Sequence, residues 1–154
     1  MKIQLSDKRI VPGALTVWNQ NGPEVDIVMD LKNLTFRPES IEEIYVFHVL
    51  DHLFAKDGEM AIKNWKQCLA PNAKIHILND DFEYICRAIV GGDIDIDIYN
   101  NLHNHPAQYS QNSLTSLLVK RGFDVNHIVV WYNGNPDHME KKHYEFILTA
   151  TKNG

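Results

Sequence analysis

The sequence predicts an α/β protein whose sheet is mostly parallel and ends in an antiparallel hairpin. Short segments rich in β-branched and aromatic residues alternate with helical patterns from the N-terminus to Gly122. Two further strand-like segments then follow each other across a polar loop, which is typical of a hairpin. The 154 residues, 44% of them hydrophobic, are enough for one core, so we expect a single domain over 1–154.

The first half of the chain supplies four of the predicted strands. Lys2–Leu5 and Ala14–Trp18 are short β-compatible runs, and Pro12-Gly13 marks a turn between them. Val25–Met29 and Ile41–Phe47 are the next candidates, because both are rich in β-branched or aromatic residues. The first connection holds at most a turn or two of helix, yet we expect the first two strands to lie side by side and parallel.

A helix is predicted over Lys56–Leu69, because its apolar residues recur at helical spacing and it stops before Pro71. Its expected buried face consists of Met60, Ile62, Trp65, Cys68 and Leu69. A strand over Lys74–Leu78 follows. The next helix is expected to begin with Asp80 or Asp81 as its cap and to end at Gly91-Gly92.

The last helix is signalled by Ser110 at its start and by Arg121-Gly122 at its end. Phe123–Trp131 and His143–Thr151 are the two strands of the predicted hairpin. We expect this hairpin to close the far side of the sheet.

Composition narrows the classes of partner. The formal net charge is −5, which argues against a nucleic-acid binder that relies on clustered cations. The N-terminus lacks the extended apolar region of a signal peptide, and no apolar run approaches the length that spans a bilayer. We therefore expect a soluble, cytoplasmic protein without membrane partners.

Four phrases in order resemble class I S-adenosylmethionine-dependent methyltransferases. Two of them lie in Tyr45–Leu78, which looks like the family's strand, helix and strand: HVLDH at 48–52 resembles its "hVLEH", and Trp65 through Pro71 resembles its "W..vLkP". Val25–Leu31 and its continuation resemble "aDiv.Dl", and the Tyr109–Val125 stretch resembles "ys...L..lL...GF.v". The resemblance implies a Rossmann-like class I methyltransferase fold and S-adenosylmethionine as cofactor.

The resemblance also implies where the cofactor would bind, and there the sequence departs from the family. Ser6, Asp7 and Lys8 stand where the family has glycines whose amides meet the methionine carboxylate. Trp18, followed by Asn19, stands where the family has an acidic residue that accepts hydrogen bonds from the ribose hydroxyls. Asp30 matches the adenine-contacting position. The cofactor-binding residues expected by this correspondence are Leu5, Ser6, Asp7, Trp18, Asn19, Asp30, Leu31 and Phe47.

His48 and His52 are the candidate catalytic residues. His48 is the first choice for a general base, because the unperturbed pKa of histidine is close to neutrality. The two histidines are four apart, but the acid that a helical zinc motif needs directly after the first is replaced by Val49. The alternating Asp93, Asp95 and Asp97 resemble the start of a calcium loop that lacks its glycine and glutamate. We expect no metal from these motifs.

The stretch with His103, His105 and Tyr109 is either a loop that faces the acceptor substrate or an ordinary polar loop shaped by Pro106. The resemblance predicts a methyltransferase-like protein with a divergent cofactor site, acting on a small molecule or a sugar-containing metabolite. The alternative is a non-catalytic protein of the same fold that binds a ligand or partner in the same cleft.

Overall fold

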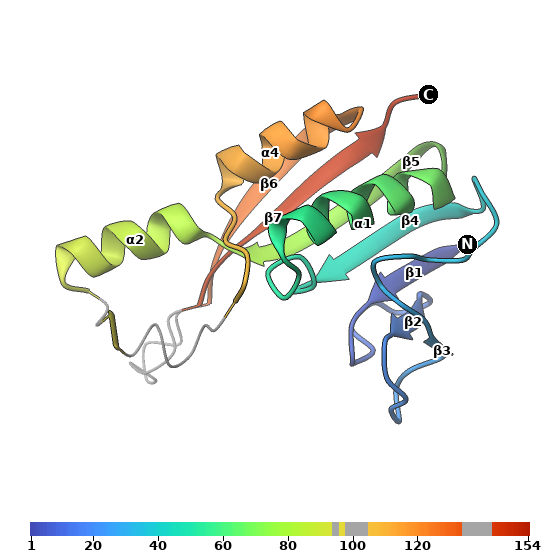
Figure 1. The fold of residues 1–154 in the computed structure, drawn as a ribbon, viewed down its shortest axis with the longest axis horizontal. Coiled ribbons are helices and arrows are strands. Elements are labelled where there is room, and N and C mark those ends of the chain that lie inside the picture. The colour runs from blue at the N-terminus through green and yellow to red at the C-terminus, as the bar shows by residue number, and fades with distance from the viewer. Residues whose placement is uncertain (94–95, 98–104, 134–142) are drawn as a thin grey trace.

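The computed structural model describes residues 1–93, 96–97, 105–133 and 143–154 (Figure 1). Its strands are β1 (Lys2–Leu5), β2 (Leu15–Trp18), β3 (Ile27–Val28), β4 (Ile41–Phe47), β5 (Leu69–Asp80), β6 (Phe123–Asn133) and β7 (His143–Lys152). Its helices are α1 (Ala55–Cys68), α2 (Phe82–Gly91) and α4 (Gln111–Lys120). Asp95 and His103, which entered the calcium and loop interpretations, lie outside the described residues, as does the loop 134–142 between β6 and β7.

The described strands form one seven-stranded sheet in the order β3-β2-β1-β4-β5-β7-β6. The five strands from β3 to β5 are parallel, whereas β7 pairs antiparallel with both β5 and β6. The predicted hairpin at the far side and the parallel pairing of β1 with β2 are both confirmed. The predicted strand over Val25–Met29 shortens to Ile27–Val28, because only these two residues pair with β2.

The helices α1 and α4 lie over the same face of the sheet (Figure 1). Trp65 of α1 is fully buried, and its indole Nε1 donates to the Leu31 carbonyl at 2.7 Å. The expectation that Met60 belongs to the buried face is wrong: its side chain is 60% exposed, and the smaller Gly58 and Ala61 take part in the contact with the core instead.

The ends of the other two helices follow their sequence signals. Ser110 caps α4 by accepting from the Ser113 amide, and Gly122 follows the helix with φ +78°. α2 ends on Gly92, also at positive φ. Asp81 stands at the N-cap of α2 as predicted, but its side chain makes no capping bond, because it accepts from Gln111 Nε2 at 2.6 Å.

A buried amide organises the short crossover between β1 and β2. The connection contains no helix, and the Gln4 side chain, fully buried, makes the bonds that hold it. Its Nε2 donates to the Lys8 carbonyl at 2.7 Å and to Thr16 Oγ1 at 2.9 Å. Its Oε1 accepts from the amides of Ile10 at 3.1 Å and Val11 at 2.6 Å. The amide thereby uses both hydrogens and both lone pairs.

Within the described residues, none of the helices has both the length and the apolar content that crossing a membrane requires.

Candidate cofactor and acceptor site

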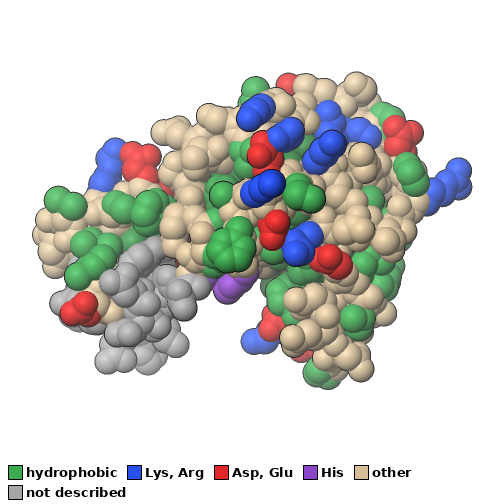
Figure 2. All heavy atoms as spheres, viewed as in Figure 1, with side chains coloured by type: hydrophobic (Ala, Val, Ile, Leu, Met, Phe, Trp, Pro, Cys, Tyr) green, Lys and Arg blue, Asp and Glu red, His purple; other side chains and the backbone are tan. Residues whose placement is uncertain are grey.

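Parallel pairing brings the carboxyl ends of three strands to one edge of the sheet. Leu5 at the end of β1 lies opposite Val17 on β2 and Val46 on β4. The next residues on β2 and β4, Trp18 and Phe47, therefore lie at the same edge, and both side chains are half-buried. In open α/β sheets, ligands collect at this edge. Figure 2 shows the surface hollowed beside the N-terminal strands, with a histidine side chain in the recess.

Side chains that suit the adenosine end of a cofactor lie exposed beside this edge. Asp30 follows β3, and its Oδ1 accepts from the Lys32 amide at 2.9 Å, which fixes the turn that carries it. Asn19 follows β2 and is exposed. Leu31 is different: its side chain is 6% exposed and belongs to the core, so it supports Asp30 rather than meeting a ligand.

The methionine end of the site does not fit the cofactor in the same way. The Ser6 side chain is 3% exposed and its Oγ accepts from the Lys8 amide at 3.2 Å, which uses a donor that a glycine-rich loop would present to the ligand. Asp7 is exposed and adds negative charge where a carboxylate would bind. Arg9 is held by Asp26 at 2.6 Å and is not available to offset that charge.

His48 lies at the end of β4 with a backbone φ of +49°, which is uncommon for a residue other than glycine. Its amide donates to the Leu78 carbonyl at 3.1 Å. The ring Nε2 is 2.8 Å from Glu145 Oε1 on β7, and Nδ1 is 3.5 Å from Asp51 Oδ2. Both nitrogens of the imidazole thus face carboxylates, and His48 links β4 to β7 across β5.

These contacts change the protonation of His48. Burial alone would lower its pKa, but the neighbouring carboxylates of Asp51 and Glu145 and the charge of Asp80 outweigh burial and raise the pKa to about 10. The pKa of His48 thus lies well above the unperturbed value that made it the first choice for a general base. An imidazolium that is bonded to Glu145 and lies beside the Asp51 carboxylate is not a general base at neutral pH.

The raised pKa of His48 predicts a loss of stability at high pH. A histidine whose pKa rises on folding contributes stability that is complete below about pH 6.5 and disappears as the pH rises towards 10. Between pH 7 and 10 we expect the free energy of unfolding to fall by about 1–2 kcal/mol more in the native protein than in His48→Asn. Asparagine tolerates the positive φ.

Urea unfolding followed by circular dichroism at several pH values measures this difference. His127→Asn, which removes an exposed histidine on β6, is the matched control and should keep the native pH profile. Equal pH profiles for the native protein and His48→Asn would exclude a protonated, paired His48.

The structure gathers further charged and polar groups around His48. Asp51 is 1% exposed and lies 3.3 Å from His105 Nδ1, and Asp80 at the end of β5 lies 3.8 Å from the same nitrogen. His52 is exposed, and its ring meets that of His105 edge-on at 4.6 Å. His105, one of the two loop histidines considered above, therefore lies beside His52. The contact between residues 51 and 105 joins segments far apart in sequence, which no local motif could reveal.

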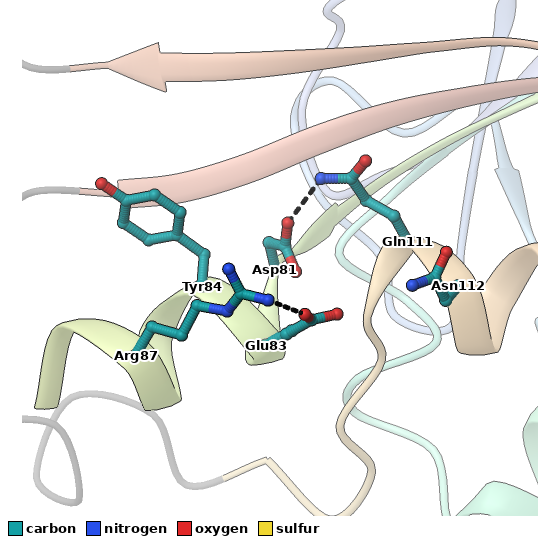
Figure 3. Close-up of a pocket in the computed structure, with 6 residues that line it drawn as sticks. All are labelled: Asp81, Glu83, Tyr84, Arg87, Gln111 and Asn112. Carbon is teal, nitrogen blue, oxygen red and sulfur yellow. Dashed lines mark hydrogen bonds and ion pairs between the residues drawn. The ribbon is translucent and has the colours of Figure 1, made fainter. Parts of the chain in front are cut away.

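A polar pocket of about 250 Å³ opens between the starts of α2 and α4 (Figure 3). Arg87 and Glu83 form an ion pair at 2.6 Å on one side of it, and Asp81 and Gln111 form the hydrogen bond already described. The ring of Tyr84 stands beside them (Figure 3). Donors and acceptors of this kind suit a ligand with hydroxyl groups.

The sheet order and the terminal antiparallel pair together define the fold. The chain has the Rossmann-like fold of class I S-adenosylmethionine-dependent methyltransferases. Its resemblance to this family, inferred above from four sequence phrases, is confirmed by residues 8–77, which match the family model described as a methyltransferase domain.

Solved structures agree on the fold. A methyltransferase from Methanosarcina mazei has a TM-score of 0.61 at 15% identity, over 93% of this chain and 73% of that one. One from Thermotoga maritima, described as a possible histamine N-methyltransferase, has a TM-score of 0.64 at 15% identity, over 90% and 72%. Magnesium protoporphyrin IX methyltransferase from Synechocystis, with bound S-adenosylhomocysteine, has a TM-score of 0.56 at 14% identity, over 91% of this chain and 65% of that one. Comparison with curated proteins found no match.

Proposed function

We propose that the protein is a methyltransferase-type protein with a divergent cofactor site, which holds S-adenosylmethionine mainly by its adenosine end. The observation that carries this proposal is the register of β1, β2 and β4, which brings Trp18 and Phe47 to one edge. Asp30 and Asn19 follow the neighbouring strands with exposed side chains. When bound, the cofactor supplies its sulfonium methyl group to an oxygen or nitrogen of the acceptor.

In this proposal each predicted cofactor residue has a distinct part. Asp30 and Asn19 bind the adenosine through hydrogen bonds, and Trp18 and Phe47 form apolar walls. Leu5 and Leu31 support the site from the core, since their side chains are 0% and 6% exposed. Ser6 and Asp7 shape the methionine end without the glycine amides, so that end contributes little affinity.

The acceptor is proposed to be a small molecule or a sugar-containing metabolite. The pocket beside Asp81 offers carboxylate, amide and guanidinium groups together with an aromatic ring, which is a common setting for hydroxyl-rich ligands (Figure 3). Of the two predicted catalytic histidines, His52 is the one whose side chain is open to solvent, and we place it on the acceptor side. His48 acts as a charged link that fixes the end of β4.

A non-catalytic protein with the same cleft is the rival function. The observation that favours it is the occupied methionine end, where Ser6 binds the loop's own amide. Calorimetric titration with S-adenosylmethionine, its demethylated product and adenosine separates the two. Binding of all three compounds in the micromolar range supports the proposed site. If none of the three binds, the non-catalytic function is supported.

Removal of the Asp30 carboxylate is expected to weaken adenosine binding about tenfold, which is about 1.4 kcal/mol. The reason is that the adenine ring would lose a charge-assisted hydrogen bond to the carboxylate. The measurement is the adenosine dissociation constant of Asp30→Ala by calorimetry. Asp124→Ala, which removes an exposed carboxylate on β6, is the control and should bind as the native protein does. An unchanged constant for Asp30→Ala would remove Asp30 from the site.

A further inference from the structure

Histidines and carboxylates from three parts of the chain meet beyond the end of β4. Asp51 and His52 lie in the turn that follows this strand, Asp80 ends β5, and His105 begins the segment that leads to α4. One ligand atom each from Asp51, His52 and His105 lies within 4.8 Å of the others. The matched sequence phrases contain Asp51 and His52 but do not predict that His105 lies beside them.

Asp51 is a buried anion without an ordinary hydrogen bond. Its side chain is 1% exposed, and among the described residues neither carboxylate oxygen has a hydrogen-bond partner. The groups that face it are two imidazoles, with His48 Nδ1 at 3.5 Å and His105 Nδ1 at 3.3 Å from Oδ2. A carboxylate in such a place needs compensation by a cation or a metal ion.

The distance between His105 and Asp51 differs from the distance between His48 and Glu145. His105 Nδ1 is 3.3 Å from Asp51 Oδ2, longer than the usual N–H···O range. Two ligands bound about 2.0–2.1 Å from a tetrahedral zinc ion are about 3.3 Å apart, so this spacing matches the edge of a metal site. By contrast, His48 Nε2 and Glu145 Oε1 are 2.8 Å apart, which is a direct hydrogen bond with no room for an ion between them.

The backbone holds these ligands in place. The Ala107 amide donates to the Asp51 carbonyl at 3.3 Å, which ties the segment of His105 to the turn after β4. Tyr109, 7% exposed, anchors the same segment: its hydroxyl packs so closely on Gly58 of α1 that a Cβ there would lie 2.7 Å from it. A site built on fixed segments loses little entropy when it binds its ion.

We propose that Asp51, His52 and His105 bind one divalent transition-metal ion, with zinc as the best match. Two imidazoles and one carboxylate form a ligand set that zinc sites with catalytic roles use, and such sites keep a fourth position open. Because His52 is exposed, solvent can reach the cluster from its side. Metal binding is independent of methyl transfer. A role in holding an acceptor hydroxyl and lowering its pKa rests on the proposed function.

Titration of the untagged, metal-free full chain with zinc chloride tests the site directly. We expect one ion per chain, a rise in melting temperature on adding zinc, and visible absorption bands of tetrahedral cobalt when cobalt replaces zinc. His52→Gln and His105→Gln should each weaken zinc binding at least tenfold, and Asp51→Asn should do the same. His127→Gln, which removes an exposed histidine outside the cluster, should bind zinc like the native protein.

His52→Gln keeps the test decisive if a buried variant fails to fold, because His52 is exposed. Absence of zinc binding in the native protein, or equal losses in His52→Gln and His127→Gln, would overturn the proposal. These titrations contain no cofactor, so their failure leaves the cofactor site untouched. In the same way, silence towards adenosine compounds would refute the proposed function and leave the metal site standing.

Discussion

Replacing Ser6, Asp7 and Lys8 by Gly-Cys-Gly is expected to raise the affinity for S-adenosylmethionine by about ten- to a hundredfold, or about 1.4 kcal/mol for each power of ten. The adenosine dissociation constant should stay within about threefold of the native value. The physical reason is local. Ser6 Oγ now accepts from the Lys8 amide, and Asp7 brings a negative charge towards the methionine carboxylate. Glycines would free the amides and remove the repulsion.

Trp18→Asp distinguishes binding of the adenosine end of the cofactor from binding of its methionine end. A carboxylate at position 18 can accept hydrogen bonds from the ribose hydroxyls. It should therefore raise the affinities for S-adenosylmethionine and for adenosine by similar factors. The replacement of Ser6, Asp7 and Lys8 should raise the affinity for S-adenosylmethionine alone. Both constants come from calorimetric titration of each variant.

One result in the native protein would contradict the loop argument before any replacement. If it already binds S-adenosylmethionine more than tenfold more tightly than adenosine, the existing loop holds the carboxylate. Lys8 would then be the group responsible, since it forms no ion pair with any other described residue and Arg9 is held by Asp26.

Gln4→Leu is expected to lower the free energy of unfolding by about 2–4 kcal/mol. Leucine has a similar size but removes all four hydrogen bonds of the buried amide, which now hold the connection between β1 and β2. The amides of Ile10 and Val11 would lose their partner, and their partial burial limits replacement by water. Urea unfolding followed by tryptophan fluorescence and circular dichroism gives the difference.

Gln20→Leu is the matched control, because Gln20 is exposed in the connection after β2. It should change the free energy of unfolding by less than about 0.5 kcal/mol. A loss of that small size for Gln4→Leu would show that the crossover does not depend on the buried amide. If the loop instead loosens without global unfolding, amide exchange at Ile10 and Val11 should accelerate while that of β5 stays slow.

The strands and helices could be predicted where local chemistry decides them. Ile41–Phe47 is predicted and observed with the same bounds, because its β-branched and aromatic residues fit a half-buried strand on their own. The same holds for the capped start of α4 and the glycine that ends α2. The errors arise where contacts with other parts of the chain decide the outcome. Met60 has helical spacing but is exposed, and the Asp81 side chain accepts a hydrogen bond from Gln111 instead of capping its helix.

By itself, the sequence determined the class of the protein: the order of strands and helices, and the ligand edge that parallel pairing implies. It also showed Ser6, Asp7 and Lys8 in the turn where the resemblance implies glycines, because residue type is read directly. Only the tertiary structure decided the charge of His48 and the meeting of Asp51 with His105. The physical reason is that a pKa, like a metal site, depends on charges a few ångströms apart, and folding brings those charges together from distant positions in the chain.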